Sequence, residues 1–184
     1  MRIAGFIDND MVDGEGVCVS VWMQGCPHKC KGCHNPETWS FTGGMEYDDF
    51  TIYNKLGKAL NANGVKRNFS LLGGEPLCKP NVLASNKLGN FVKNNFPDRK
   101  IFLWTGYTID DLVRMGPPYT YCFMWADTII DGKYQEELRD VTLKLRGSSN
   151  QRVINILHVH DDKMMQNILC LDETGDVLYV DTHS

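Results

Sequence analysis

The fold is decided by one stretch of ten residues, Val17-Cys18-Val19-Ser20-Val21-Trp22-Met23-Gln24-Gly25-Cys26 (VCVSVWMQGC). Six of its first seven residues are apolar and three of these are β-branched valines, which predicts a short buried strand over 17–23. The polar and glycine residues that follow predict a loop, because glycine commonly ends a regular segment. The chain repeats this order of strand and loop further along.

Helices alternate with the later strands. Phe50, Tyr53, Leu56 and Leu60 recur at spacings of three and four, which predicts an amphipathic helix over about 47–62. Thr108 with Asp111 forms a candidate capping box for another short helix. The remaining apolar segments predict strands over 68–72, 101–104, 125–130 and 152–159, and a helix near 82–95.

This alternation predicts an α/β fold with a mostly parallel sheet. Ligands bind at the carboxyl ends of such strands, so the polar residues found there predict one shared site. A closed barrel of eight strand–helix units needs about 250 residues. The chain has 184, so any barrel must be partial. The polar strand ends are Gly25-Cys26, Gly73-Gly74-Glu75, Thr105-Gly106 and Asp131-Gly132-Lys133.

The end of the chain departs from this pattern. Apolar residues over 168–172 and 177–180 flank Glu173-Thr174-Gly175-Asp176, which predicts a β-hairpin. We therefore expect a main domain over 1–160 and a C-terminal appendage over 161–184.

Composition limits the class of protein. Hydrophobic residues make up 42% and charged residues 23%, which is typical of a globular domain. The net charge is −4 and no Lys/Arg cluster is longer than Arg99-Lys100, so nucleic acid is not expected as a partner. The sequence contains no run of about 18 apolar residues, so no membrane-spanning segment is predicted. Residues 1–10 do not resemble a signal peptide, and we expect a cytoplasmic protein.

The sequence contains seven cysteines, and disulfide bonds are rare in the reducing cytoplasm expected for this protein. Their odd number favours metal or redox chemistry over a disulfide framework. Cys18, Cys122 and Cys170 lie in apolar runs and are expected in the core, and the isolated Cys78 is interpreted as a packing residue.

Cys26, Cys30 and Cys33 form a C-x3-C-x2-C pattern in the loop after the first strand. Three thiolates can hold a tetrahedral metal or three irons of a cubane cluster. Structural zinc, completed by His28 or His34, is the other interpretation, and spacing alone does not separate the two. Structural zinc sites usually use a second cysteine pair, and the chain offers none.

Gly73-Gly74-Glu75 is the second chemical signal. Two glycines after a strand let a ligand approach the backbone closely, and Glu75 could accept a hydrogen bond from a ligand ammonium group. Such a segment by itself is more often a tight turn. Together with three clustered cysteines it becomes specific.

These motifs resemble the radical S-adenosylmethionine (SAM) enzymes and, more narrowly, the anaerobic ribonucleoside-triphosphate reductase activating protein family. The similar stretches follow the order of that family and cover roughly residues 12 to 153. Gly32 stands before the third cysteine, as in the reductase activators, where many radical SAM proteins carry an aromatic residue. The tail beyond about residue 155 has no counterpart in the family. The similar stretches are residues 26–35, 73–77, 104–107, 131–134 and 145–152.

The resemblance implies a partial (β/α) barrel of the radical SAM type over residues 1–160. It implies that Cys26, Cys30 and Cys33 bind three irons of a [4Fe-4S] cluster, whose fourth iron is open to the amino and carboxylate groups of SAM. No catalytic residue is implied beyond the cluster and SAM. The implied SAM contacts are Gly32, Cys33, His34, Gly73, Gly74 and Glu75, with Thr105, Asp131 and Lys133 as further candidates.

The implied activity is reductive cleavage of SAM and formation of a glycyl radical on the large subunit of anaerobic ribonucleoside-triphosphate reductase. A flavodoxin-like or similar protein would donate the electron. Two alternatives stay open: another small radical SAM enzyme acting on a small molecule, and a structural zinc module. The stretch 145–152 argues against the first alternative, and Gly73-Gly74-Glu75 argues against the second.

Overall fold

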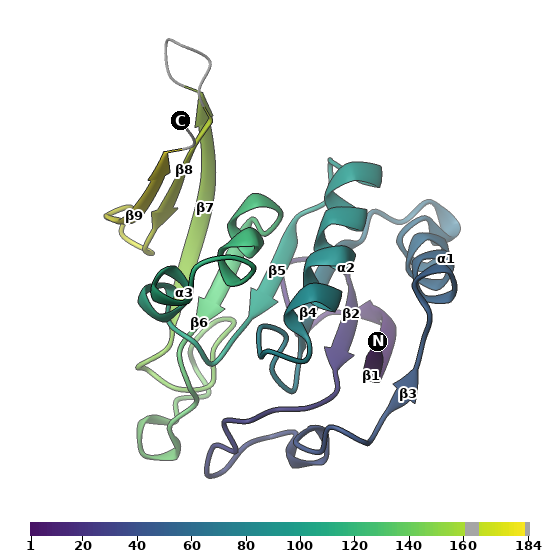
Figure 1. Cartoon of the computed structure of the whole chain (residues 1–184), viewed down its shortest axis with the longest axis horizontal. Coiled ribbons are helices and arrows are strands. Elements are labelled where there is room, and N and C mark those ends of the chain that lie inside the picture. Colours follow the sequence, from purple (N-terminus) through teal and green to yellow (C-terminus); the bar gives the residue numbers. More distant parts are fainter. Residues whose placement is uncertain (161–165, 183–184) are drawn as a thin grey trace.

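One sheet of nine strands organises the part of the chain that the computed structural model describes, residues 1–160 and 166–182 (Figure 1). The strand order is β3-β1-β2-β4-β5-β6-β7-β8-β9. The strands are Arg2–Asp10 (β1), Cys18–Met23 (β2), Met45–Glu46 (β3), Asn68–Gly73 (β4), Ile101–Trp104 (β5), Thr128–Asp131 (β6), Arg152–His160 (β7), Gln166–Leu171 (β8) and Val177–Thr182 (β9).

The direction of the strands was predicted correctly only for the centre of the sheet. β2, β4, β5 and β6 run parallel, as the alternation with helices indicated. The prediction of a mostly parallel sheet is wrong for the rest, because five of the eight pairings between described strands are antiparallel. The connection from β1 to β2 spans only residues 11–17, and a parallel crossover needs about a dozen residues or more. The sheet is open, since its outer strands β3 and β9 do not pair with each other.

Helices α1 (Asp49–Leu60), α2 (Val82–Asn95) and α3 (Ile109–Met115) connect the central strands, and Figure 1 shows α2 in front of β4 with α1 and α3 on either side. Asp48 caps α1 by accepting a hydrogen bond from the backbone of Thr51. The predicted capping box of Thr108 and Asp111 is confirmed at the start of α3. Short 3-10 helices cover Pro36–Thr38 (η1), Ala62–Gly64 (η2), Tyr119–Met124 (η3) and Glu136–Leu138 (η4).

The core lies between the sheet and these helices. Cys18, Cys122 and Cys170 are fully buried in it, as predicted. Trp125 is also fully buried and donates its indole N–H to Asn86. Its ring fills the space where a Cβ at Gly89 of α2 would lie, so a glycine is required there. Trp125 follows η3 and packs in the core outside any strand. The strand predicted over 125–130 therefore begins later than expected, since β6 starts at Thr128.

The predicted C-terminal hairpin is present, with β8 and β9 paired antiparallel around residues 172–176. β8 also pairs with β7, so the hairpin continues the main sheet. Ile168 and Cys170 of β8 belong to the same core as the central strands. The boundary between 1–160 and 161–184 remains a prediction, and residues 161–165 and 183–184 of that tail lie outside the described part of the chain.

The register of the parallel strands brings their carboxyl ends together. Met23 is paired with Gly73, Leu71 with Leu103, and Trp104 with Ile130. The segments that follow these residues therefore leave the sheet side by side. Among the described residues, no helix is long and apolar enough to cross a lipid bilayer.

Candidate cofactor-binding site

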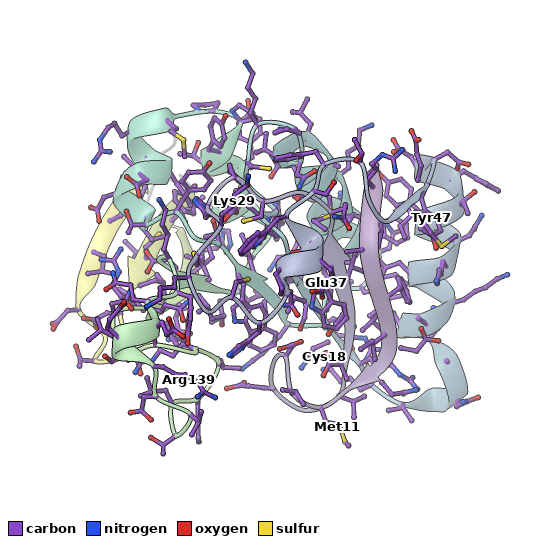
Figure 2. All side chains as sticks on the ribbon, turned by 90° about the horizontal axis from the view of Figure 1, so that it is seen from below. Met11, Cys18, Lys29, Glu37, Tyr47 and Arg139 are labelled. Atoms are coloured by element: carbon purple, nitrogen blue, oxygen red, sulfur yellow. The ribbon has the colours of Figure 1, made fainter. Side chains whose placement is uncertain are left out.

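A cavity of about 500 Å³ opens at the carboxyl edge of the parallel strands. Residues that follow β2, β4, β5 and β6 line it, so the prediction of one shared site at these strand ends agrees with the structure. Figure 2 views the molecule from this edge and shows the loops that carry Met11, Lys29 and Arg139 around it.

Most of the predicted site residues meet in this cavity. Gly32 and Asp131 are not among its lining residues, and the Asp131 carboxylate has other partners. The predicted residues that do line the cavity are Cys26, Cys30, Cys33, His34, Gly73, Gly74, Glu75, Thr105 and Lys133.

The three cysteines lie on the cysteine loop, residues 26–33, which follows β2. Cys26 is buried, and Cys30 and Cys33 are half-buried. Burial raises the pKa of the Cys26 and Cys30 thiols, so both are protonated at neutral pH when no metal is bound. Among the described residues, no three His, Cys, Asp or Glu side chains are already gathered around a metal position. The donors nevertheless fit an iron–sulfur cluster in kind and place, since three thiols line one cavity.

The two glycines of the Gly73-Gly74-Glu75 segment have a structural reason that the sequence did not reveal. A Cβ at Gly74 would lie 2.4 Å from the carbonyl oxygen of Gly25, and one at Gly73 would lie 2.6 Å from the backbone of Met23. The backbone of Glu75 donates to the same Gly25 carbonyl at 2.9 Å. The glycines thus let the loop after β4 lie directly against the start of the cysteine loop.

Glu75 is the polar centre of this contact. Its side chain is 1% exposed, and both carboxylate oxygens already accept hydrogen bonds. Oε1 accepts from the backbone of Leu77 at 2.9 Å and from Thr105 Oγ1 at 2.8 Å. Oε2 accepts from the backbone of Gly106 at 2.6 Å and lies 2.8 Å from His28 Nε2. His28, the alternative zinc ligand, therefore has this ring nitrogen engaged with a carboxylate.

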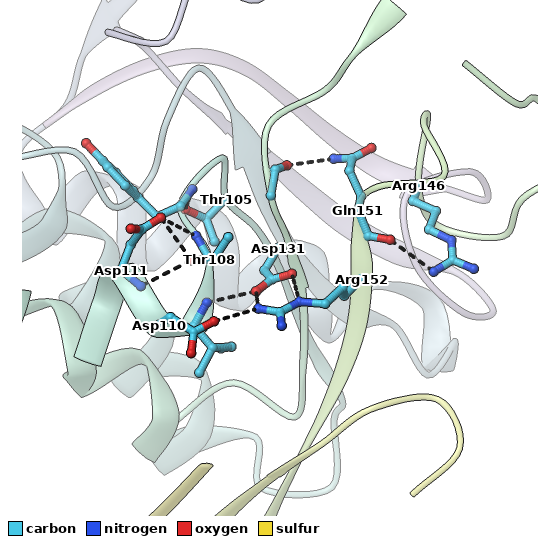
Figure 3. Close-up of polar contacts among 11 residues, drawn as sticks. Thr105, Thr108, Asp110, Asp111, Asp131, Arg146, Gln151 and Arg152 are labelled. Atoms are coloured by element: carbon cyan, nitrogen blue, oxygen red, sulfur yellow. Dashed lines mark hydrogen bonds and ion pairs between the residues drawn. The ribbon is translucent and has the colours of Figure 1, made fainter. Parts of the chain in front are cut away.

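Asp131 holds neighbouring elements together (Figure 3). Its fully buried carboxylate accepts from Arg152 Nε at 2.9 Å and Nη2 at 2.5 Å, and from the backbone of Ile109 at 2.8 Å. These bonds join the end of β6 to β7 and to the start of α3. The bond to Asp131 also raises the pKa of Arg152, and the buried carboxylate is balanced by that charge.

The segment between β6 and β7 forms a wall of the cavity. Trp104 Nε1 donates to the carbonyl of Leu145 at 2.7 Å, and Gln151 Nε2 donates to the carbonyl of Gly132 at 3.1 Å. Gln151 Oε1 accepts from the backbone of Gly147 at 3.0 Å. The stretch 145–152, recognised in the sequence only by resemblance, therefore shapes the cavity through its own hydrogen bonds.

Sequence reasoning missed Asp13, which lines the cavity from the loop between β1 and β2. Its burial and the neighbouring charge of Asp10 raise the pKa of the Asp13 carboxyl to about 6. Asp10 in turn accepts hydrogen bonds from the backbone of Val12 and Asp13. No local motif marks this loop, because its place beside the cavity depends on the pairing of β1 with β2.

The open sheet and the cysteine-lined cavity at its strand ends define a candidate iron–sulfur protein. The family model described as "4Fe-4S single cluster domain" matches residues 12–154. Several curated relatives carry the name anaerobic ribonucleoside-triphosphate reductase-activating protein, and the chain belongs to this family.

Three relatives illustrate the extent of the match. The protein of Haemophilus influenzae is 33% identical, over 82% of this chain and 96% of its own length. The protein of Vibrio cholerae is 38% identical, over 77% of this chain and 90% of its own length. The protein of Escherichia coli K12 is 34% identical, over 78% of this chain and 92% of its own length.

Proposed function

We propose that this chain is a radical SAM activating enzyme. It would cleave SAM reductively at a [4Fe-4S] cluster held by Cys26, Cys30 and Cys33. The product of its action would be a glycyl radical on the large subunit of anaerobic ribonucleoside-triphosphate reductase, the enzyme after which its relatives are named.

One observation carries the proposal. The three cysteines after β2 and the Gly73-Gly74-Glu75 segment after β4 line the same cavity, although about 40 residues separate them. A structural zinc site has four protein ligands that complete its coordination, so it needs no adjoining cavity. A cluster with three protein ligands, in contrast, leaves one iron for a ligand that a cavity must accommodate.

The chain's own residues would hold and orient the two groups. The three thiols would bind three irons. The backbone around Gly73 and Gly74, the backbone around Cys33 and His34 and, as further candidates, Thr105 and Lys133 would contact SAM from the lining of the cavity. The buried Glu75 carboxylate would support this lining, because its acceptor positions are taken by protein donors. Gly32 and Asp131 are not among the residues that line the cavity, and we assign Asp131 the structural role of holding Arg152.

A cluster bound there would supply one electron to the sulfonium of SAM, the bond from sulfur to the 5′ carbon would break with loss of methionine, and the hydrogen atom taken from the glycine Cα would end in 5′-deoxyadenosine. The protein orients the reacting groups and limits access of water. A flavodoxin-like protein is the proposed electron donor, and the cytoplasm is the proposed compartment.

We further propose that the open sheet is the partial barrel of the radical SAM type, with residues 161–184 as an added element. The cavity is bordered by exposed Val12 and Val141 on different loops. A loop of the reductase subunit could therefore enter between them and supply the missing cover.

The test is anaerobic reconstitution with iron and sulfide, followed by incubation with SAM, a reductant and the large reductase subunit. We expect bound iron and sulfide, 5′-deoxyadenosine, and a glycyl radical signal in electron paramagnetic resonance. Colourless protein with one bound zinc would overturn the proposal. Full turnover on a small molecule without a radical on the subunit would favour a different radical SAM enzyme.

A further inference from the structure

The Glu75 carboxylate has its acceptor positions filled by the protein itself. An ionised carboxylate offers about four lone-pair sites, and four donors lie within 2.6–2.9 Å of its oxygens. Two donors are backbone N–H groups and one is the buried hydroxyl of Thr105. The fourth, His28 Nε2, is the one that comes from the cysteine loop. A carboxylate can only accept, so this ring nitrogen carries the hydrogen.

The surroundings of His28 fix its ring in place. Its side chain is 7% exposed, whereas the neighbouring Pro27 and Lys29 are exposed. The ring of Tyr107 packs edge-on against it, with centroids 4.7 Å apart. A Cβ at Gly106 would lie 2.5 Å from the imidazole, so only glycine leaves room for the ring there.

His28 lies between Cys26 and Cys30, in the middle of the segment that carries the thiols. Backbone hydrogen bonds hold the start of this segment, where Gly25 donates to Thr38 and Cys26 donates to Trp39. Lys31 forms exposed ion pairs with Glu136 and Glu137, which contribute little energy. The buried bond from His28 to Glu75 therefore provides the strong side-chain attachment between the two cysteines.

We propose that His28 is a positioning residue whose imidazole holds the cysteine loop against Glu75, and so places Cys26 and Cys30 before any cluster is bound. The attachment joins the loop after β2 to the ends of β4 and β5 through one carboxylate. The inference rests on the proposed function only in taking these cysteines as cluster ligands. The attachment involves protein atoms only, so it can be measured in metal-free protein.

The experiment follows alkylation of single cysteines by iodoacetamide in metal-free, reduced protein, with mass spectrometry to assign each site. His28→Phe keeps a ring and removes the donor, and His28→Gln keeps an N–H donor at similar reach. Lys29→Gln is the matched control, because Lys29 is the next residue of the same loop and its side chain is exposed. The buried Cys78, outside the loop, is the internal reference.

We expect alkylation of Cys26 to be roughly tenfold faster or more in His28→Phe, the factor that one charge-assisted hydrogen bond represents. Cys78 should be unchanged, Lys29→Gln should match the parent chain, and His28→Gln should recover most of the protection. Unchanged alkylation of Cys26, or equal acceleration of Cys26 and Cys78, would overturn the proposal. If His28→Phe does not fold, His28→Ala compared with His28→Gln makes the same test.

Iron content separates this inference from the proposed function. If the parent chain binds no cluster while His28→Phe exposes Cys26, the attachment stands and the proposed function fails. If the parent chain binds its cluster and cleaves SAM while Cys26 keeps its protection in His28→Phe, the attachment is refuted and the function stands.

Discussion

Arg146, in the wall of the cavity, binds both carboxylate oxygens of Glu173, in the turn between β8 and β9. The same guanidinium donates to the carbonyl of Gln151 at 3.1 Å. Glu173 lies beyond residue 154, where the match to the iron–sulfur family model ends. The C-terminal hairpin therefore contacts a residue of the cavity wall, although it lies outside the matched part of the chain.

Replacing Glu173 with Gln should loosen this wall without unfolding the protein. Glu173 is 49% exposed, so the pair should contribute no more than about 1 kcal/mol to the free energy of unfolding. Hydrogen exchange of peptides covering residues 139–147 should become faster in Glu173→Gln. A double-mutant cycle with Arg146→Gln measures the coupling, and a coupling of zero would remove the hairpin from the support of the wall.

Single replacements of Cys26, Cys30 or Cys33 by Ala should each abolish stable cluster binding and SAM cleavage. Two remaining thiolates leave two irons without protein ligands, and such a cluster is labile. Anaerobic iron and sulfide analysis measures the loss. Cys122→Ala and Cys170→Ala are the controls, because both thiols are fully buried in the core. Equal iron loss in all five variants would contradict the assignment of the ligands.

Glu75→Gln should affect both the fold of the site and the binding of SAM. The new amide NH2 would face buried donors, and each donor left without an acceptor costs about 1–3 kcal/mol. Chemical denaturation of the metal-free protein should therefore show a loss of about 2 kcal/mol. In reconstituted protein, SAM affinity should fall by about one order of magnitude, because the strand ends that Glu75 holds together line the cavity.

Glu37→Gln is the control for this experiment, because Glu37 is exposed on η1. Within the described residues, its backbone carbonyl accepts a hydrogen bond and its side chain makes none. Unchanged stability of Glu75→Gln would show that the carboxylate does not organise the strand ends. Lower stability with unchanged SAM affinity would show that SAM binding does not depend on the strand ends that Glu75 holds.

Asp13 should make the protein less stable as the pH rises. Its pKa of about 6 in the folded chain lies above the ordinary value of 3.8, so the folded state binds the proton more tightly. The free energy of unfolding should fall between about pH 4 and pH 6 from this group and stay lower above that range. Asp13→Asn should remove this contribution.

At pH 7, Asp13→Asn should be more stable than the parent chain by about 1 kcal/mol, a figure reduced from the full linkage value because Asp13 is only half-buried. At pH 4 the two proteins should differ little. Urea denaturation at both pH values makes the comparison. A difference that is the same at both pH values would show that Asp13 keeps an ordinary pKa.

Much of the secondary structure was predictable because it is encoded locally. The strand over 101–104 and the helix over 82–95 agree with β5 and α2, and the Thr108 capping box marks the start of α3. β1 and β3 were not predicted. β1 mixes acidic residues and a glycine with its apolar ones, and β3 is only two residues long, both of them exposed. Neither segment therefore presents a clear strand pattern.

The meeting of the strand ends at one cavity was predictable from the sequence, whereas the contacts made there were not. The strand-end rule correctly brought Cys26, Glu75, Thr105 and Lys133 to one cavity. It could not show that the Asp131 carboxylate is paired with Arg152, or that the Glu75 carboxylate already accepts from four protein donors. Both facts depend on the rotamers of residues that are far apart in the chain.

The sequence by itself determined the cysteine spacing, the alternation of strands and helices, and the polar residues at each strand end, because these are properties of neighbouring residues. Only the tertiary structure decided the antiparallel flanks of the sheet and the partners of the buried carboxylates. The physical reason is distance along the chain: His28 and Glu75 are 47 positions apart, and Asp131 and Arg152 are 21 apart. A buried carboxylate requires donors, and the folded chain determines which residues provide them.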